Sequence, residues 1–327
     1  MDIGSLVFRK AVQSRGLDRR LWSGLRRALI RLQQDPTCTM PIHGRAMKVN
    51  LSHGLPLYQA HHPFYDTLPR RLGGFLRRRH GALRCVDVGA NIGDSIAAFI
   101  GGAEDRFLAI EPNPKFFGLL RANWGHSPQV TALPVLCSSG SESGAFTIRE
   151  QNGTASIVEQ ADGARLQRRT LDDLIEEQHF APVNLLKIDT DGHDFEVLEG
   201  GLRSIARDRP AVLFECDVFG RADYPQRVLS ALDAFARCAY TRYLVYDNFG
   251  HLMGRYSLAD PTAFKALLFY QLTSRFHYFD LLVMPEPDLC DFHAEETRFF
   301  AEQLAGPKRS AAQALAPGGA ADDWRRA

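Results

Sequence analysis

The alternation of short apolar runs with helical patterns after residue 84 constrains the fold of this chain most strongly. Apolar runs of strand length occur at residues 84–89, 106–111, 130–137, 183–189 and 211–216. Such runs are typical of strands covered on both faces, and helices between them form the crossover connections of a parallel sheet. Two further runs, at residues 243–246 and 279–284, are expected to pair antiparallel at the sheet edge. The pattern predicts an α/β fold around a mostly parallel seven-stranded sheet.

Different patterns flank this region. Residues 5–34 place Leu and Ala at near-helical spacing with Arg between them, which predicts amphipathic helices. We expect a basic, partly irregular N-terminal extension over residues 1–80, an α/β core over residues 81–286, and a C-terminal helix and tail over residues 287–327. From about Leu304 the tail is rich in Ala, Gly and Pro, which predicts disorder.

Charge is distributed unevenly along the chain. Residues 1–84 contain 16 Lys and Arg against 4 Asp and Glu, whereas the remaining residues contain 23 against 34. A basic extension can attract an anionic partner, such as a phosphate-bearing or lipid-linked acceptor, or it can be an ordinary solvated surface. Its most ambiguous segment contains His53, His61, His62, Tyr65 and Asp66, which could fold over the site as a lid or form a surface loop.

The six cysteines are scattered and form no Cys-x-x-Cys pair, which is typical of buried thiols in a reducing compartment. No apolar stretch approaches the length of a membrane span. We therefore expect a cytoplasmic protein, with peripheral contact at the inner membrane face as an option. The sequence does not indicate an oligomeric state.

The first predicted strand leads into a glycine-containing turn, Asp87-Val88-Gly89-Ala90-Asn91-Ile92-Gly93. A turn at this place must bend sharply and let its backbone approach a ligand, and Gly89 and Gly93 have the necessary freedom of φ. Asn91 tolerates the left-handed conformation better than most residues. The start of the following helix offers free N–H groups to a carboxylate or a phosphate. These residues predict a cofactor-binding elbow.

Glu111 ends the second predicted strand, where a carboxylate can accept hydrogen bonds from both ribose hydroxyls of a nucleoside cofactor. The dinucleotide pattern G-x-G-x-x-G is not met, because Asp87 stands where its first Gly would be. An acid there suits a cationic amino group and sulfonium and would repel a pyrophosphate. The elbow and Glu111 together favour S-adenosylmethionine over a nicotinamide dinucleotide.

Acidic residues follow the fourth and fifth predicted strands, at Asp189 and Asp191 and at Glu215. Ligands of open α/β sheets lie beyond the carboxyl ends of the strands, so these side chains should meet in one crevice. Asp189 or Asp191 could act as the base that accepts the proton of an acceptor hydroxyl, and His193 is a further candidate. Glu215 could orient the acceptor. The three carboxylates could instead hold Mg²⁺ or Ca²⁺, although their spacing matches no dedicated metal loop.

Several motifs resemble those of the FkbM family of methyltransferases, in the same order along the chain. They are VDVGANIGDS at residues 86–95, AIEPNP at 109–114, TLDDLI at 170–175, LLKIDTDGHDFEVLEG at 185–200 and the acid of LFECD at 213–217. The resemblance implies a Rossmann-like class I methyltransferase fold. It also implies an S-adenosylmethionine-dependent O-methyltransferase that acts on a hydroxyl of a sugar, a glycolipid or other glycan, or a secondary metabolite.

Carried over by position, the resemblance makes Asp87, Gly89, Asn91, Gly93 and Glu111 cofactor contacts and places Ser138 and Thr170 near the adenine. The chain departs from the family pattern at Asp191 and at His193-Asp194, where the family more often has Glu-Gly followed by a small or aromatic residue and Glu. The shorter acid at Asp191 leaves its role and the acceptor open.

Two other functional classes are compatible with this type of fold. A nucleotide-sugar or nicotinamide-dependent oxidoreductase predicts a third Gly in the elbow and a Tyr-x-x-x-Lys pair, and the sequence has neither. A non-catalytic cofactor-binding subunit predicts a degenerate elbow, whereas this one is intact. Methylation of an amino group of a protein or a nucleic acid is a further alternative within methyltransferases, although its usual Asn/Asp-Pro-Pro-Tyr signature is absent after the fourth strand. We expect no nucleic-acid partner.

Overall fold

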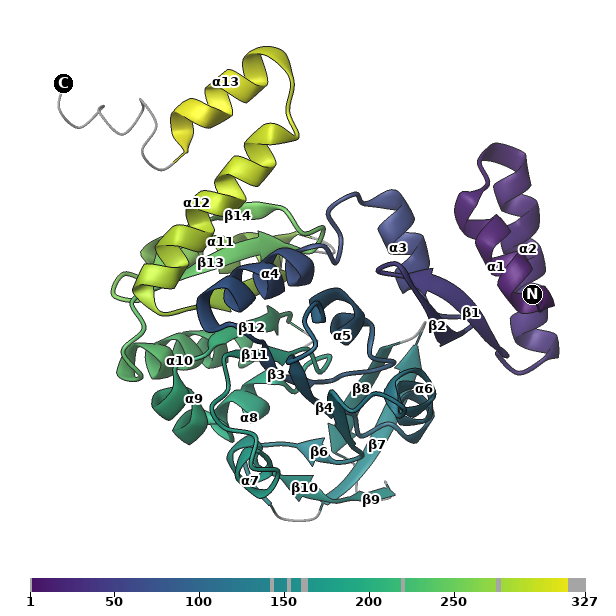
Figure 1. The fold of residues 1–327 in the computed structure, drawn as a ribbon, viewed down its shortest axis with the longest axis horizontal. Coiled ribbons are helices and arrows are strands. Elements are labelled where there is room, and N and C mark those ends of the chain that lie inside the picture. The colour runs from purple at the N-terminus through teal and green to yellow at the C-terminus, as the bar shows by residue number, and fades with distance from the viewer. Residues whose placement is uncertain are drawn as a thin grey trace.

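A computed structural model describes residues 2–141, 144–151, 154–159, 164–218, 221–274 and 278–316. Its main sheet has eight strands in the order β14-β13-β15-β12-β11-β3-β4-β5 (Figure 1). The strands are β3 Arg84–Val88, β4 Arg106–Ile110, β5 Val130–Leu133, β11 Leu185–Ile188, β12 Ala211–Cys216, β13 Arg242–Asp247, β14 Leu252–Ser257 and β15 Phe279–Val283.

The strand directions are those of a Rossmann-like sheet. β12, β11, β3, β4 and β5 are parallel neighbours, and β15 runs antiparallel between β12 and β13. The chain proceeds from β3 to β4 and β5 and then returns to β11 on the other side of β3. This reversal opens a crevice beyond the carboxyl ends of β3 and β11, where ligands of such sheets bind.

Helices cover both faces of the sheet (Figure 1). Alternate strand residues enter two separate apolar clusters: Cys85 and Leu185 pack on one side, and Val86 and Leu186 on the other. The first cluster includes residues of α4 Leu68–His80, α5 Asp94–Phe99, α6 Pro114–Trp124 and α12 Glu286–Glu302. The second includes residues of α7 Leu171–Glu177, α8 Asp194–Glu199, α9 Leu202–Asp208, α10 Tyr224–Arg237 and α11 Thr262–Thr273. Burial on both faces explains the continuous apolar runs of the sequence.

The expected α/β class and all seven expected strands are confirmed, and β14 extends the sheet by one strand beyond the antiparallel pair β13 and β15. The run at residues 130–137 forms two strands, because the chain leaves the main sheet after β5. The second of these, β6 Leu136–Cys137, pairs with β10 Arg168–Arg169. A separate three-stranded sheet is formed by β7 Gly144–Gln151, β8 Thr154–Glu159 and β9 Ala164–Leu166. The sequence also predicts a flexible stretch around the Asn152-Gly153 pair, and this pair lies outside the described residues.

The N-terminal extension contains the expected helices α1 Ile3–Gln13 and α2 Gly16–Leu32. They are followed by a hairpin of β1 Thr37–Ile42 and β2 Arg45–Asn50 and by the short helix α3 Leu55–His61. None of the described helices is both long and apolar enough to cross a membrane.

The C-terminal region differs from the expectation. The disorder expected from Leu304 is wrong for Gly306–Leu315, which form the helix α13. Ala and Gln are good helix formers, and Pro307 sits in the first turn, where a missing N–H costs little. The tail after residue 316 lies outside the described residues.

Candidate active site

The turn between β3 and α5 has the backbone conformation that its glycines and Asn91 predict. Gly89, Asn91 and Gly93 have φ values of +80°, +48° and +83°. A Cβ on Gly89 would lie 1.8 Å from the carbonyl oxygen of Asp189, so only glycine allows the turn to pass this close to the end of β11. The turn is therefore pressed against the strand end that carries the candidate base.

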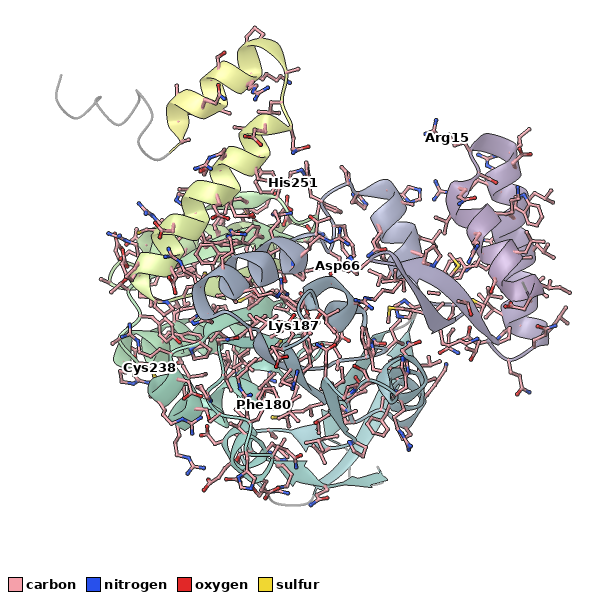
Figure 2. The ribbon with its side chains drawn as sticks, in the orientation of Figure 1. Arg15, Asp66, Phe180, Lys187, Cys238 and His251 are labelled. Atoms are coloured by element: carbon pink, nitrogen blue, oxygen red, sulfur yellow. The ribbon has the colours of Figure 1, made fainter. Side chains whose placement is uncertain are left out.

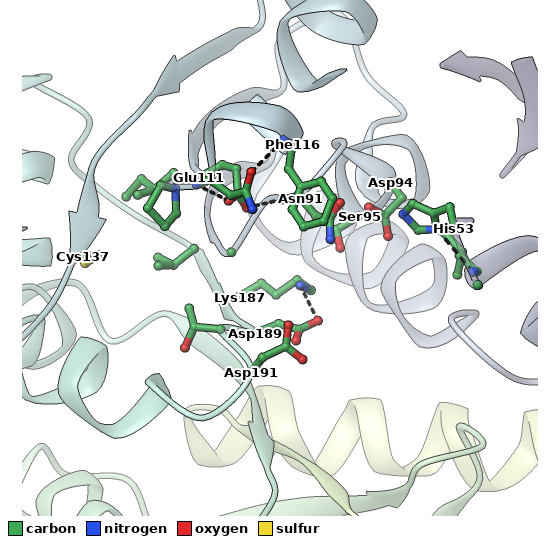
Figure 3. A pocket seen from close by; sticks show the side chains of 18 of the residues that line it. His53, Asn91, Asp94, Ser95, Glu111, Phe116, Cys137, Lys187, Asp189 and Asp191 are labelled. Atoms are coloured by element: carbon green, nitrogen blue, oxygen red, sulfur yellow. Dashed lines mark hydrogen bonds and ion pairs between the residues drawn. The ribbon is translucent and has the colours of Figure 1, made fainter. Parts of the chain in front are cut away.

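A cleft of about 1020 Å³, open to solvent, lies beyond the ends of β3, β4 and β11 (Figure 3). Five of the predicted site residues line it: Gly89, Asn91, Glu111, Asp189 and Asp191. Its apolar walls include Phe116, Leu136 and Cys137. The cleft thus collects the elbow, the predicted ribose-binding acid and two of the candidate bases.

Glu111 is held in this cleft by backbone donors. Its Oε2 accepts a hydrogen bond from the N–H of Asn91 at 2.8 Å, and its Oε1 accepts one from the N–H of Asn113 at 2.8 Å. Burial raises the pKa of Glu111 to about 7, although these backbone donors favour the carboxylate. The side chain is thus fixed in orientation at a position where its protonation state can change near neutral pH.

Lys187 joins the two strands on which the acids lie. Its Nζ is 3.1 Å from Oδ2 of Asp189 and 3.6 Å from Oδ1 of Asp87. Burial alone would lower the pKa of Lys187, but the charges of Asp189 and Asp87 outweigh it and raise that pKa well above its ordinary value. Lys187 therefore stays cationic and holds Asp189 at the edge of the cleft (Figure 3).

A second cavity of about 750 Å³ adjoins the first. Both cavities are lined by Asp189, Lys187, Asp94, Ser95, Leu55 and Tyr65. The second also receives Glu215 from β12, Asp280 from β15, Tyr278, Asn248 and, from the extension, Asp66. A ligand in the second cavity would therefore meet a ligand in the cleft beside Asp189.

Carboxyl groups dominate the second cavity. Burial raises the pKa of Asp94 to about 7 and that of Asp280 to about 8, and nearby acids reinforce both shifts. Burial and the charge of Asp189 raise the pKa of Glu215 well above its ordinary value, and its Oε2 has no hydrogen-bond partner among the described residues. At neutral pH the walls can thus both donate hydrogen bonds to hydroxyl groups and accept them.

Three of the predicted acids also lie close together. Asp189, Asp191 and Glu215 each bring a carboxylate oxygen within 4.8 Å of the other two. The convergence expected from adjacent strand ends is therefore observed. The arrangement suits either a hydroxyl-bearing acceptor or a divalent cation with oxygen ligands.

Two residues of the predicted elbow are placed behind the cleft. Asp87 is fully buried and does not line the cavity, because its side chain faces Lys187 on the neighbouring strand. Gly93 packs against Trp124, whose Nε1 donates to its carbonyl oxygen at 2.9 Å. The acidic groups that would face a cofactor are thus Asp94, Glu111, Asp189 and Asp191 rather than Asp87.

His193, Ser138 and Thr170 lie outside the described linings of both cavities. Nε2 of His193 is 3.1 Å from Oγ of Ser138, and Nδ1 of His193 is 3.7 Å from Oε2 of Glu196. These contacts of both ring nitrogens hold the imidazole beside α8. Thr170 caps α7 by accepting a hydrogen bond from the N–H of Asp173. These contacts give each of the three residues a structural role.

The N-terminal extension contributes residues that the strand pattern does not indicate. His53, Leu55, Tyr58 and Tyr65 line the cleft, whereas His61 and His62 are not among the lining residues. Burial lowers the pKa of His53 to about 4, so its imidazole is neutral at physiological pH. The sequence left this segment as either a lid over the site or a surface loop. His53, Tyr65 and Asp66 line the cavities, which fits a segment that covers the site.

Comparison with known proteins agrees with this geometry. Residues 87–241 match the family described as "Methyltransferase FkbM domain". A 118-residue stretch is 31% identical to the hexuronic acid methyltransferase AglP of Haloferax volcanii, covering 35% of this chain and 48% of that protein. The match thus spans about half the length of this curated relative.

Solved structures of methyltransferases give low-scoring overlays. The methyltransferase FkbM of Methylobacillus flagellatus KT is 16% identical with a TM-score of 0.36, covering 73% of this chain and 54% of that one. A precorrin-6y C5,15-methyltransferase of Geobacter metallireducens GS-15 is 10% identical with a TM-score of 0.34, covering 62% and 79%. The family match includes the elbow, Glu111, Asp189 and Glu215, so residues 87–241 of this chain are similar to the FkbM methyltransferase domain across the candidate site.

Proposed function

We propose that this protein is an S-adenosylmethionine-dependent O-methyltransferase that acts on a hydroxyl of a sugar, a glycan or a related metabolite. The observation that carries the proposal is the meeting of two cavities at Asp189, one built on the elbow and Glu111 and the other walled by carboxyl groups. A transferase needs such a pair of adjoining sites, because donor and acceptor must be held in contact.

The residues of the cleft fit the proposed cofactor. Gly89 and Asn91 of the elbow line the cleft, and Glu111 presents a carboxylate that could accept from two ribose hydroxyls. Asp94, Asp189 and Asp191 suit a ligand that carries an amino group and a sulfonium, and they oppose a pyrophosphate. This favours S-adenosylmethionine over the nicotinamide cofactor of the oxidoreductase alternative.

The acceptor class is supported by the chemistry of the second cavity. Its carboxyl groups and the hydroxyl of Tyr278 can form hydrogen bonds with a ligand rich in hydroxyl groups. The relative AglP is named a hexuronic acid methyltransferase, which is in keeping with a sugar acceptor. A cytoplasmic location is proposed with this activity, since all six cysteines are free thiols.

We assign Asp189 as the base, because it alone of the four candidate catalytic residues lines both cavities. A bound S-adenosylmethionine would supply an electrophilic methyl group to the acceptor oxygen, with the thioether as leaving group and the hydroxyl proton to be removed. The Asp189 carboxylate, oriented by Lys187, would accept that proton. Asp191 and Glu215 would position the acceptor hydroxyl, and His193 would have a structural role through its contacts with Ser138 and Glu196.

The same three carboxylates are the competing site for a divalent cation. We assign them to the acceptor, because Asp189 already has Lys187 as its cationic partner. Turnover that persists in EDTA supports this assignment. Turnover that EDTA abolishes and Mg²⁺ restores would contradict it.

Calorimetry tests the cofactor assignment. S-adenosylmethionine and its demethylated product should bind, whereas NAD and nucleotide sugars should not. Binding of NAD alone would overturn the proposal in favour of an oxidoreductase. Binding of S-adenosylmethionine without methyl transfer to any glycan, glycoside or secondary metabolite offered would instead support a non-catalytic subunit.

Substitution tests the base. Asp189→Asn should retain cofactor binding and lower kcat by about 10²–10⁴-fold, the usual contribution of a general base. The matched control is Asp233→Asn, which removes an exposed carboxylate on α10 and should leave kcat unchanged. Undiminished turnover in Asp189→Asn would remove Asp189 from the assignment.

A further inference from the structure

Helices α1 and α2 form a hairpin at the N-terminal side of the molecule, away from the main sheet (Figure 1). One face of α2 packs inward through the half-buried Trp22, Leu29 and Ile30. No residue of α2 is fully buried, although the helix spans Gly16–Leu32. Most of its surface is therefore turned outward.

The outward surface of α2 carries an apolar stripe. Leu17, Leu21, Leu25 and Leu32 are 79%, 68%, 41% and 81% exposed. Their spacing of four, four and seven residues keeps them in one stripe along a helix, and the exposed Ala28 falls in the same stripe. Single exposed leucines are ordinary on protein surfaces, but an aligned set on one helix marks a docking face.

Arginines border this leucine stripe. Arg20, Arg27 and Arg31 are exposed, and their spacing of seven and four residues aligns them on the neighbouring strip of the helix. Across residues 2–34, eight Lys and Arg stand against two Asp. Side chains project freely from both helices, with Arg15 at the tip of the hairpin (Figure 2). Leucine and arginine therefore lie side by side on one exposed surface.

We infer that α2 docks this protein on the surface of an anionic membrane. In an interfacial helix, leucines enter the boundary between headgroups and acyl chains, and neighbouring arginines contact lipid phosphates while their apolar stems lie along the membrane. A nucleic acid would use the arginines but not the aligned leucines. A second copy of this chain would use the leucines but would bring two basic surfaces together.

Contacts of Arg26 connect this docking helix to the active-site cleft. Arg26 lies on the inward side of α2, where its Nε donates to the carbonyl of Leu51 at 2.7 Å and its Nη2 to that of His53 at 3.1 Å. His53 and the adjacent Leu55 line the cleft. The extension thus has the membrane-binding face on one side and a wall of the cleft on the other, which would fix the direction in which the cleft faces a membrane.

Sedimentation with vesicles tests the inference on the full-length protein, without cofactor or acceptor. The protein should sediment with vesicles of equal parts phosphatidylglycerol and phosphatidylcholine and remain in solution with phosphatidylcholine alone. Arg20→Gln/Arg27→Gln should weaken binding roughly thirtyfold, given the usual contribution of two surface arginines. Leu21→Ser/Leu25→Ser should weaken binding at least as much.

The control variant is Leu272→Ser/Leu315→Ser, which removes two exposed leucines on α11 and α13 and should bind as the parent does. Thermal melting checks that each variant is folded. Every substituted side chain is exposed, so each variant is expected to fold. Unchanged vesicle binding in both α2 variants would overturn the inference. Two other results would also overturn it, if the protein did not bind vesicles. One is a dimer that dissociates only in the leucine variant, and the other is binding of DNA or RNA that is lost only in the arginine variant.

Discussion

Lys187 and Asp189 form an ion pair of 3.1 Å at the junction of the two cavities. Strand pairing creates the arrangement: Lys187 of β11 is the register partner of Asp87 on β3, so its ammonium also lies 3.6 Å from that buried carboxylate. A residue two positions before the candidate base thus compensates a buried charge and orients an exposed one. Substitution of Lys187 should therefore lower stability through the loss of its contact with Asp87 and lower turnover through the loss of its contact with Asp189.

Lys187→Met should lower the free energy of unfolding by about 3–5 kcal/mol, because it leaves Asp87 buried without a countercharge. Adding Asp87→Asn should restore much of that stability, since it removes the buried carboxylate that had lost its countercharge. Turnover should stay low in the double variant, because Asp189 still lacks its partner. Urea unfolding and kcat measure the two effects, and recovery of kcat along with stability would contradict an orienting role.

Cofactor affinity should depend on pH through Glu111. Burial raises its pKa to about 7, and hydrogen bonds from ribose hydroxyls favour the carboxylate, so binding of S-adenosylmethionine should release a proton below that pH. Affinity should therefore rise with pH by at most about tenfold per unit up to roughly pH 7 and then level off. Glu111→Gln should bind weakly and without this dependence. Calorimetry in buffers of different ionisation enthalpy detects the proton, and the absence of its release would contradict the assignment.

Asp280 should discriminate between neutral and anionic acceptors. Its pKa is raised to about 8 by burial and then by the charge of Asp189, so it is protonated at neutral pH and ionises above. Ionisation places a negative charge in the acceptor cavity, so KM for a uronic acid glycoside should increase on the order of tenfold as the pH passes through 8. KM for a neutral glycoside should stay constant, and Asp280→Asn should remove the increase. An equal increase for both acceptors would point to another group.

The elbow should tolerate no side chain at position 89. A Cβ there would lie 1.8 Å from the carbonyl oxygen of Asp189 at a φ of +80°, so Gly89→Ala should lose cofactor binding and about 1–3 kcal/mol of stability. Gly118→Ala is the matched control. It lies within α6 with no atom inside 4 Å of the new Cβ, and it should stabilise the protein by roughly 0.5–1 kcal/mol. Equal cofactor affinity in both variants would contradict the close packing of the elbow.

The sequence could predict those parts of the site that depend on local pattern. Gly89, Asn91 and Glu111 stand at the ends of buried strands, so their types and positions along the chain sufficed to place them at the cleft. The burial of Asp87 behind the cleft could not be predicted in this way, because it depends on the register that places Lys187 of β11 beside Asp87 of β3. The interaction of His193 with Ser138 likewise joins residues far apart along the chain.

Long-range packing also explains the elements that were missed. The edge strand β14 is partly exposed and contains Gly254, so it lacks the continuous apolar run of the central strands. His53 and Tyr65 reach the cleft only because the extension packs against the core. Histidine and tyrosine are residue types that often occur in functional sites. The irregular sequence around His53 and Tyr65, however, is equally typical of a surface loop.

A buried ion pair should hold the extension to the C-terminal region. Arg71 of α4 donates from Nε and Nη2 to Glu296 of α12 at 2.5 and 2.9 Å, and the hydroxyl of Tyr246 donates to the same carboxylate at 3.1 Å. Glu296→Gln should lower the free energy of unfolding by about 3–5 kcal/mol, because the guanidinium loses its buried countercharge. KM for the acceptor should also rise, since Leu68 and Pro69 of α4 line the second cavity.

The neighbouring pair Arg78–Glu295 joins the same two helices but is 60% and 42% exposed. Glu295→Gln should therefore cost less than about 1 kcal/mol and leave KM unchanged, because solvent screens the exposed pair. Urea unfolding of the two variants provides the comparison. Losses of similar size would show that burial does not set the strength of the contact between α4 and α12, and an unchanged KM in Glu296→Gln would show that this contact does not position the acceptor wall.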